Sequence, residues 1–231
     1  MNAPQDPELR YERKFLAPGP DPDFTARRLA LTPARFARAH PPRWVNSVYL
    51  DTASLALWEE GVEGAPERTK IRVRWYGALF GEILSPVLEV KTKFGHVGTK
   101  ARTPLSPAAF SPGMSAQAFL SRLLENPSPG LRARVLPCRP VVLVRYCRMY
   151  LESADRRFRA TLDTEIACHA FDRMAARRAL VPPDPRRVVL EVKYAPAHDP
   201  EARRLLAPLP LRLDRSSKYL WAVQTLYGAL S

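Results

Sequence analysis

The chain has 231 residues, with 36 Lys or Arg against 23 Asp or Glu, so its formal net charge at pH 7 is +13. Apolar residues make up 46% and charged residues 26%, which is typical of a folded globular protein and argues against an intrinsically disordered chain. The charge excess predicts a polyanionic partner, but by itself it does not distinguish nucleic acid, an acidic membrane and phosphate.

Several other classes of protein are excluded by simple features of the sequence. No apolar run approaches the roughly 18 residues that span a bilayer, and the N-terminus lacks the regions of a signal peptide. The cysteines (Cys138, Cys147 and Cys168) form no C-x-x-C pair, and the histidines lack the spacing of metal ligands, which argues against a disulfide framework and a zinc site. We therefore expect a cytoplasmic protein without a transmembrane segment.

The 24 prolines fall mostly between the segments that have a regular hydrophobic pattern, and they mark the ends of those segments. They predict loops at residues 18–22, 41–42, 104–112, 127–140, 182–185 and 196–210. None of these loops is long enough, or rich enough in Gly and Ser, to be an interdomain linker. We therefore expect a single domain over residues 1–231.

Between the loops the dominant hydrophobic period is two, which predicts β-strands. Strands are expected at residues 10–15, 45–50, 69–76, 87–94, 98–103, 141–151, 157–165 and 188–194. Helices are expected at residues 52–60, 115–125, 200–206 and 216–227, the last with Ser216 as its N-cap. Strands with interspersed helices indicate an α+β domain built on antiparallel sheet.

Charged residues repeat at every second position, so they share one face of each strand. Lys70, Arg72 and Arg74 lie about 6.8 Å apart along one face, and at an effective dielectric near 20 each neighbouring pair repels by about 2 kcal/mol. One interpretation is an ordinary solvated face. The alternative is a barrel whose charged faces converge on a bound polyanion and on balancing carboxylates. Those carboxylates, which would partner the bases or hold a divalent metal, are Glu12, Glu89 and Glu191.

The segment Val87-Leu-Glu-Val-Lys91 recurs 102 residues later as Val189-Leu-Glu-Val-Lys193. The repeat is either a coincidence between two amphipathic strands or a sign of two similar halves that face each other. The sequence leaves both interpretations open.

Nine short motifs, none of them specific alone, occur in the order found in one known family. They are Tyr11–Phe15, Tyr49–Thr52, Lys70–Gly77, Leu88–Lys91, Lys100–Arg102, Arg145–Arg148, Arg159–Thr164, Leu190–Lys193 and Ser217–Tyr219. Together they resemble the catalytic domain of the vacuolar transporter chaperone (VTC) complex in its bacterial stand-alone form. That family belongs to the triphosphate tunnel metalloenzymes, also called CYTH-like proteins.

The resemblance implies an eight-stranded antiparallel β-barrel, the triphosphate tunnel, with helices packed on the outside. It also implies an ATP-dependent polyphosphate polymerase, a metal-dependent phosphotransferase that moves the terminal phosphate of ATP to an inorganic polyphosphate chain with Mn²⁺ or Mg²⁺. The residues that it places in contact with phosphate are Lys14, Arg72, Arg74, Lys91, Lys100, Arg148, Arg159 and Lys218. Less secure matches on the same faces are Lys93, Lys193 and Glu89. The metal ligands would be Glu191 and Glu12.

One departure from the superfamily concerns the first motif. Tunnel hydrolases usually begin with E-x-E-x-K, whereas this chain has Arg10-x-Glu12-x-Lys14. The difference weakens the interpretation as a two-metal hydrolase and agrees better with a VTC-type domain. Two alternatives stay open: a tripolyphosphatase or nucleoside triphosphatase in the same tunnel, and a non-catalytic binder of polyphosphate or nucleic acid. The expected partners are ATP and polyphosphate, with no specific nucleic acid. A membrane-protein partner and the oligomeric state are left open.

Overall fold

The computed structural model describes residues 11–17, 21–95, 97–125, 129–171, 180–184, 186–214 and 217–228, so Arg10 and Ser216 lie outside it. The chain divides into two compact units. Unit 1 comprises residues 1–43, 147–166 and 183–215, and unit 2 comprises residues 44–146, 167–182 and 216–231. The two units are described separately below.

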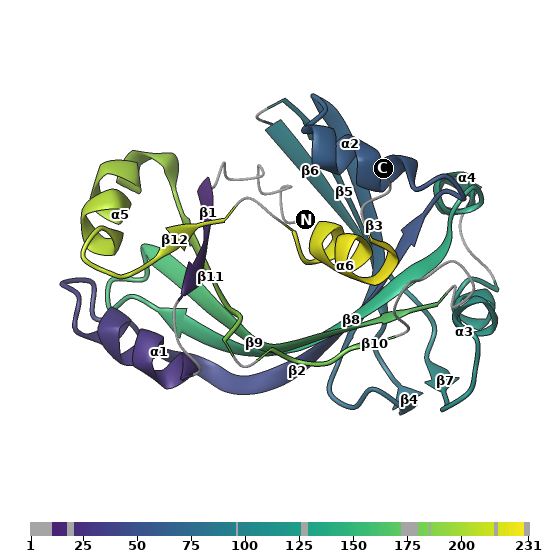
Figure 1. The fold of residues 1–231 in the computed structure, drawn as a ribbon, viewed down its shortest axis with the longest axis horizontal. Helices are drawn as coiled ribbons and strands as arrows, with labels where there is room; N and C mark the ends of the chain where they lie inside the picture. Colours follow the sequence, from purple (N-terminus) through teal and green to yellow (C-terminus); the bar gives the residue numbers. More distant parts are fainter. Residues whose placement is uncertain are drawn as a thin grey trace, which may run out of the picture. The chain divides into compact units, whose positions relative to one another are not determined.

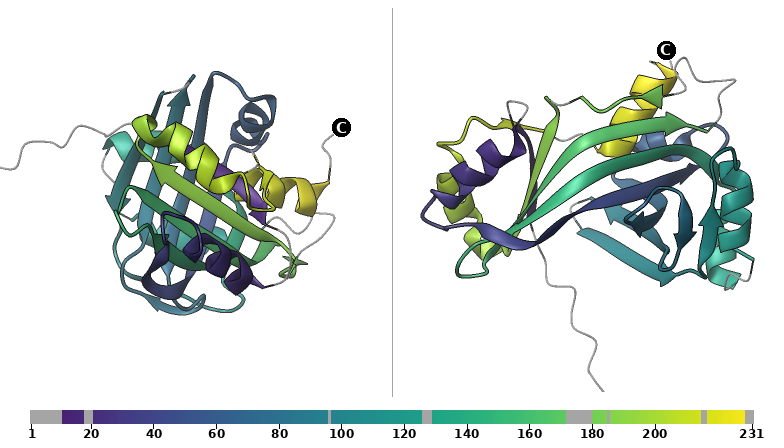
Figure 2. Two further views of the ribbon diagram at one scale, coloured as in Figure 1. Left: turned by 90° about the vertical axis from the view of Figure 1, so that its left-hand side faces the viewer. Right: turned by 90° about the horizontal axis from the view of Figure 1, so that it is seen from below.

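Strands dominate the described chain (Figure 1). They are β1 (Tyr11–Ala17), β2 (Ala37–Asp51), β3 (Glu67–Tyr76), β4 (Gly81–Ile83), β5 (Val87–Phe94), β6 (Val97–Pro104), β7 (Ala108–Phe110), β8 (Arg139–Glu152), β9 (Phe158–Ala170), β10 (Leu180–Val181), β11 (Val188–Tyr194) and β12 (Arg212–Leu213). The main sheet has the order β12-β1-β11-β9-β8-β2-β3-β5-β6, with β10 beside β9, while β4 pairs with β7. The neighbours β8 and β9 lie side by side in Figure 2.

The expected α+β class with a mostly antiparallel sheet is confirmed, but a closed barrel is not found. The path of the main sheet ends at β12 and at β6, and within the described ranges no pairing joins these two strands. Both are poor templates for further pairing, because β12 has only two residues and β6 carries Lys100 and Arg102. Very short or charged edge strands are the usual protection of an open sheet.

The core of unit 1 lies on one face of its strands. Two helices supply residues to it, α1 (Pro22–Ala30) and α5 (Asp199–Leu206), the latter preceded by the short 3-10 helix η1 (Pro196–His198). Leu29 of α1 and Leu205 of α5 belong to the same buried cluster as alternate residues of β9 and β11. These alternate residues are Phe158, Ala160, Leu162, Leu190, Val192 and Tyr194. The opposite face of these strands is therefore left to the charged residues.

The core of unit 2 follows the same alternation. Ile71, Val73 and Trp75 of β3 pack with Phe119 of α3 (Ala116–Leu123) and with Val135 of α4 (Pro129–Val135). The remaining helices are α2 (Ala56–Glu63) and α6 (Lys218–Tyr227), which contact each other. A Cβ added to Gly61 of α2 would come within 2.8 Å of the Leu220 side chain of α6, so a glycine allows this close approach.

The sequence predicts β5 and β11 at both ends, but it misplaces other boundaries. Pro41 and Pro42 were expected in a loop and lie within β2. They precede residues 45–50, which pair with β3, so no hydrogen bond is required from them in that ladder. Helix α4 also lies where a loop was expected, and α1 is an additional helix that follows the N-cap Asp21. Helix α6 begins at Lys218, and its cap is Ser217, whose hydroxyl accepts from the Leu220 amide at 3.1 Å.

No helix among the described residues is long and apolar enough to cross a membrane.

Candidate functional site

Unit 2 carries a basic sheet face across β3, β5 and β6. The strand register places Lys70 opposite Lys91 and Lys91 opposite Lys100. In the next row Arg72 lies opposite Glu89, and Glu89 lies opposite Arg102. Directly opposed residues of an antiparallel pair point to the same face, where like charges destabilise the sheet. We call this set of residues the basic face: Arg68, Lys70, Arg72, Arg74, Glu89, Lys91, Lys93, Lys100 and Arg102.

Glu89 is the acidic centre of the basic face and is only 3% exposed. Its Oε2 accepts from Arg72 Nε at 2.8 Å and Nη2 at 2.6 Å, and it lies 3.6 Å from Arg74 Nη1. Its Oε1 lies 2.8 Å from Lys100 Nζ and 3.3 Å from Arg102 Nε. One buried carboxylate therefore contacts four cations, which leaves an excess of positive charge on this face.

The electrostatics of the cluster follow from this arrangement. Burial raises the pKa of Glu89, but Arg72, Arg74 and Lys100 outweigh burial and hold that pKa at about 2. Burial lowers the pKa of Lys100, as do the charges of Arg72 and Arg74, and its bond to Glu89 offsets this only in part. The pKa of Lys100 is thus below its ordinary value. An anion near this lysine would favour its charged form.

Two tyrosines extend the cluster beyond the carboxylate. Arg74 is buried and donates to the Tyr146 hydroxyl at 3.1 Å and to Ser47 Oγ at 3.2 Å. The ammonium of Lys218 lies 4.6 Å from the centre of the Tyr146 ring, a distance typical of a cation–π contact. Arg74 and Lys218, separate in the sequence, thus meet at one tyrosine.

Tyr49 provides the second link. It accepts from Arg72 Nη1 at 3.2 Å, and its ring stacks on Tyr219 with the centroids 5.0 Å apart. Burial raises the pKa of Tyr49, but the charges of Arg72 and Arg74 outweigh burial and lower it. Since Tyr219 follows Lys218 in α6, this stack holds the start of α6 against the face that carries Arg72. Helices were expected on the outside of the sheet, away from its charged face, and α6 departs from that expectation.

Unit 1 has a second charged cluster on β1 and β11, the Glu191 cluster, formed by Glu12, Lys14, Glu191 and Lys193. Lys14 Nζ lies 2.8 Å from Glu12 Oε1 and 3.7 Å from Glu191 Oε2. Lys193 Nζ lies 2.7 Å from Glu191 Oε1 and 3.8 Å from Glu12 Oε2. Burial raises the pKa of Glu191, but Lys193, Lys14 and Arg148 outweigh burial and hold it well below its ordinary value.

Two arginines of unit 1 that the family resemblance assigns to phosphate are paired with carboxylates. Arg148 of β8 makes a two-pronged contact with buried Asp163, at 2.5 Å from Nε and 2.7 Å from Nη2. Arg159 of β9 donates from Nε to Glu152 at 3.3 Å and is more exposed. Arg148 is therefore a fixed cation, whereas Arg159 lies at the surface.

The two charged clusters differ in how well their carboxylates could hold a divalent metal. In the described part of the chain, no group of three or more His, Cys, Asp and Glu could hold a metal ion. Glu12 and Glu191 share Lys14 and Lys193, so their carboxylates are neighbours, and Mg²⁺ commonly binds one or two carboxylates together with substrate phosphates. These two residues fit a metal held jointly with phosphate. Glu89 does not fit, because four cations surround its oxygens.

The structure thus groups the predicted residues into two sets. Unit 2 brings together Arg72, Arg74, Lys91, Lys93, Lys100, Lys218 and Glu89, and unit 1 brings together Lys14, Glu12, Glu191, Lys193, Arg148 and Arg159. The two copies of the repeated segment fall in different units, and each places a glutamate among lysines or arginines. Sequence reasoning missed the contacts of Arg102, Tyr49, Tyr146 and Asp163. The role of Arg102 could have been inferred from its two-residue spacing to Lys100, whereas the contacts of Tyr49, Tyr146 and Asp163 depend on strand pairing.

Solved structures share this fold at low sequence identity. A protein from Hippeastrum, presented as a candidate adenylyl cyclase with a dominant triphosphatase activity, matches with a TM-score of 0.51 and 14% identity over 91% of this chain and 93% of its own. A candidate adenylate cyclase from Vibrio parahaemolyticus matches with a TM-score of 0.50 and 13% identity over 93% of this chain and 98% of its own. A candidate adenylate cyclase from Bacillus halodurans matches with a TM-score of 0.52 and 12% identity over 91% of this chain and 94% of its own. These likenesses show that the chain shares the fold of these structures.

The family follows from the sequence itself. The family model of the VTC domain matches residues 30–227. The chain belongs to the VTC domain family, and the resemblance drawn from the nine motifs is confirmed. No curated protein matches the sequence.

Proposed function

We propose that this protein is an ATP-dependent polyphosphate polymerase, and that residues 1–231 act as one catalytic domain. The observation that carries the proposal is the row Lys70, Lys91 and Lys100 on three neighbouring strands. Like charges that face each other across strands destabilise a sheet, and a bound phosphate chain would bring negative charge to this row. Membership in the VTC domain family supports the choice of polyphosphate among polyanions.

The chemistry is a phosphoryl transfer. A terminal oxygen of the polyphosphate chain forms a bond to the terminal phosphorus of ATP, the bond from that phosphorus to its bridging oxygen breaks, and ADP leaves. This reaction needs in-line positioning and charge stabilisation more than covalent participation of the protein. Fixed cations supply both without reorganising during the reaction. A divalent metal, when bound, neutralises charge on the transferring group.

Roles can be assigned to residues of each unit. In unit 2, Arg72 and Arg74 are held by Glu89, Tyr49 and Tyr146, so their guanidinium groups are positioned before phosphate binds. The proposed phosphate contacts of unit 2 are Arg72, Arg74, Lys91, Lys100 and Lys218, and those of unit 1 are Lys14, Arg148 and Arg159. Glu12 and Glu191 would hold Mn²⁺ or Mg²⁺ together with phosphate oxygens.

A triphosphatase is the second candidate. The Hippeastrum protein of the same fold is described as having a dominant triphosphatase activity, and with water as the acceptor the same cations would stabilise hydrolysis. The two reactions differ only in the oxygen that attacks phosphorus. Arg10, where tunnel hydrolases usually have a carboxylate, favours the polymerase.

The experiment is to incubate the purified full-length protein with ATP and Mn²⁺ and to separate the products on a gel. A ladder of long polyphosphate supports the polymerase. Release of orthophosphate without polymer supports the triphosphatase, and no turnover with retained, salt-dependent polyphosphate or nucleic-acid binding supports a non-catalytic binder. The Lys91→Gln variant should lose the activity, and Arg122→Gln, at an exposed position on α3, serves as the matched control.

A further inference from the structure

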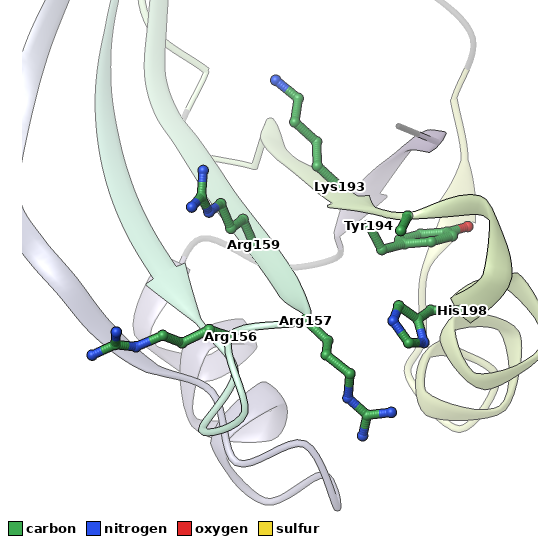
Figure 3. A pocket seen from close by; sticks show the side chains of 7 residues that line it. Arg156, Arg157, Arg159, Lys193, Tyr194 and His198 are labelled. Carbon is green, nitrogen blue, oxygen red and sulfur yellow. The ribbon is translucent and has the colours of Figure 1, made fainter. Parts of the chain in front are cut away.

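Unit 1 contains a small basic cavity of about 210 Å³ at the turn between β8 and β9. It is lined by Arg156, Arg157, Arg159, Lys193, Tyr194, Ala195 and His198. Figure 3 shows Arg159 and Lys193 rising from neighbouring strands, with His198 beside Tyr194. The cavity is smaller than a typical pocket for a drug-sized ligand, and four of its seven lining residues are cationic. It suits a small anion or a short stretch of an anionic chain.

The charges of this cavity are not balanced from within. Lys193 lies directly opposite Arg159 in the β9–β11 ladder, an arrangement of like charges that destabilises a sheet. Arg159 shares one carboxylate, that of Glu152, with Arg156, at 3.3 Å and 3.9 Å respectively. Two guanidinium groups on a single carboxylate leave one positive charge in excess.

Arg156 has an unusual backbone for its residue type. Its φ is +61°, in the left-handed region that favours Gly and costs stability for other residues. The turn around it is fixed, because the Arg156 amide donates to the Ser153 carbonyl at 2.9 Å and the Phe158 amide to Ser153 Oγ at 3.0 Å. The Arg156 side chain is 84% exposed. A charged side chain that is held toward solvent at a conformational cost is a candidate for ligand binding.

The neighbouring Arg157 has a different role. It contacts both oxygens of Glu201, at 2.9 Å and 3.1 Å, and one oxygen of Asp155 at 2.6 Å. These two carboxylates balance its charge and tie the turn to α5. Arg157 therefore fixes the wall of the cavity, and Arg156, Arg159 and Lys193 are the groups available to an anion.

The aromatic side chains of the cavity are engaged in packing. The rings of Tyr194 and His198 both lie against Phe158, with centroids 5.7 Å and 5.9 Å away. The Tyr194 hydroxyl donates to Asp199 at 2.7 Å. The cavity thus favours an inorganic anion over a nucleoside, whose base would need an aromatic surface.

We propose that this cavity extends the phosphate site of unit 1, and that Arg156, beside Arg159 and Lys193, binds phosphate groups of an inorganic chain beyond those at the Glu191 cluster. Lys193 belongs to both, since its ammonium contacts Glu191 at 2.7 Å, so one chain would pass from the cluster into the cavity. The inference rests on the proposed function for the identity of the ligand as a phosphate chain. It adds Arg156, which has no role in phosphoryl transfer, as a determinant of chain binding.

The test compares two substitutions of left-handed arginines. Arg156→Gly removes one cation of the cavity at a backbone position that glycine prefers, so the fold is retained. Arg35→Gly makes the same change at φ +48°, at an exposed position that does not line the cavity, and is the matched control. Titrations with long-chain polyphosphate and with tripolyphosphate at fixed salt should show a roughly five-fold loss of affinity for the long chain in Arg156→Gly alone.

A third variant should raise the affinity for long-chain polyphosphate instead of lowering it. Glu152→Gln removes the carboxylate that Arg156 and Arg159 share, so it should strengthen binding of long-chain polyphosphate about three-fold. Unchanged binding in Arg156→Gly, equal losses in both glycine variants, equal losses for tripolyphosphate, or weaker binding in Glu152→Gln would overturn this extension of the phosphate site. Failure of the proposed function is recognised separately. In that case wild-type protein makes no polymer from ATP, while the binding differences among these variants persist.

Discussion

The hydroxyl of Tyr219 donates a hydrogen bond to the carboxylate of Asp51, which lies 168 positions earlier in the chain. Asp51 is fully buried and also accepts from the amides of Leu57 and Trp58, each at 2.9 Å. The pKa of Tyr219 is raised by its burial and by the Asp51 charge, so the hydroxyl stays protonated as the donor. One carboxylate therefore joins the start of α2 to the start of α6, and Lys218 is placed next to Tyr146 as a result.

The first prediction concerns this bond. Tyr219→Phe keeps the ring that stacks on Tyr49 but removes the donor to Asp51, so it should lower the free energy of unfolding by about 1–3 kcal/mol. Because the first turn of α6 carries Lys218, the KM for ATP should also rise. Urea denaturation and steady-state kinetics measure the two effects.

Tyr227→Phe is the control for this prediction. The Tyr227 hydroxyl donates to the Val141 carbonyl at 3.0 Å, at the other end of α6. Its loss should reduce stability but leave the KM close to the wild-type value. A similar KM in all three proteins would show that the Asp51 bond does not position Lys218.

The second prediction uses the row of opposed lysines. Lys91→Gln removes a charge that faces Lys70 and Lys100 across two strand pairs, so relief of like-charge repulsion should keep the free energy of unfolding of the variant within about 1 kcal/mol of the wild-type value. Its affinity for tripolyphosphate and its turnover should nevertheless fall by at least ten-fold. Thermal unfolding measures the stability of the variant, and isothermal titration measures its affinity for tripolyphosphate. A variant that is less stable by more than this margin and retains binding would contradict the prediction.

Arg74 behaves differently from Lys91, and the comparison separates two roles. Arg74 is buried and contacts Glu89, Ser47 and Tyr146, so Arg74→Ala removes internal partners as well as a phosphate contact. It should cost about 3 kcal/mol of stability, because the loss of one member of a buried pair leaves the others uncompensated. Loss of activity in Arg74→Ala is thus informative only beside a measured unfolding curve.

The third prediction is the pH dependence of stability that Glu89 contributes. The cations around Glu89 outweigh the effect of burial and place its pKa at about 2 in the folded protein, below its ordinary value of 4.5. A carboxylate whose pKa is lowered on folding stabilises the protein above its unfolded pKa, and this contribution is lost as the pH falls from about 4.5 toward 2. The difference in unfolding free energy between the wild type and Glu89→Gln should therefore shrink over that range.

Urea denaturation at several pH values measures this difference. The matched control is Glu82→Gln, an exposed position on β4 of the same unit, which should differ little from the wild type at any pH. A difference for Glu89→Gln that stays constant down to pH 3 would mean that Arg72 and Arg74 do not lower the pKa of this carboxyl.

The faces of the strands were predictable from the sequence, and their register was not. Alternation is a local property, so it correctly assigned Ile71, Val73 and Trp75 to the core and left Arg72 and Arg74 on the other face. Which residue lies opposite Lys91 depends on how β5 aligns with β3 and β6, and a shift of one residue would reverse every side chain. The alignment is set by packing of the apolar face, which no single strand encodes.

The same distinction explains what was missed at the site. The contact of Tyr49 with Tyr219 and the bond from Arg74 to Tyr146 join segments far apart in the chain. None of these three tyrosines lies in a charge pattern that marks it in advance. Their motifs were recognised only through family resemblance, while their mechanical role, holding arginines in place, required the structure.

The last prediction concerns the metal. Glu191→Gln removes one of two neighbouring carboxylates that fit a divalent ion shared with phosphate, and it also leaves Lys14 and Lys193 with one carboxylate fewer. The variant should bind tripolyphosphate without metal at least as tightly as the wild type, because a negative charge that repels the ligand is gone. Its Mn²⁺-dependent turnover should fall by about 100-fold or more, since the ion loses half of its protein ligands. Glu201→Gln, on α5 of the same unit, is the control that should retain its Mn²⁺ response. If Glu191→Gln retains wild-type turnover at the same Mn²⁺ concentration, Glu191 does not hold the metal, and its role is limited to ordering the two lysines.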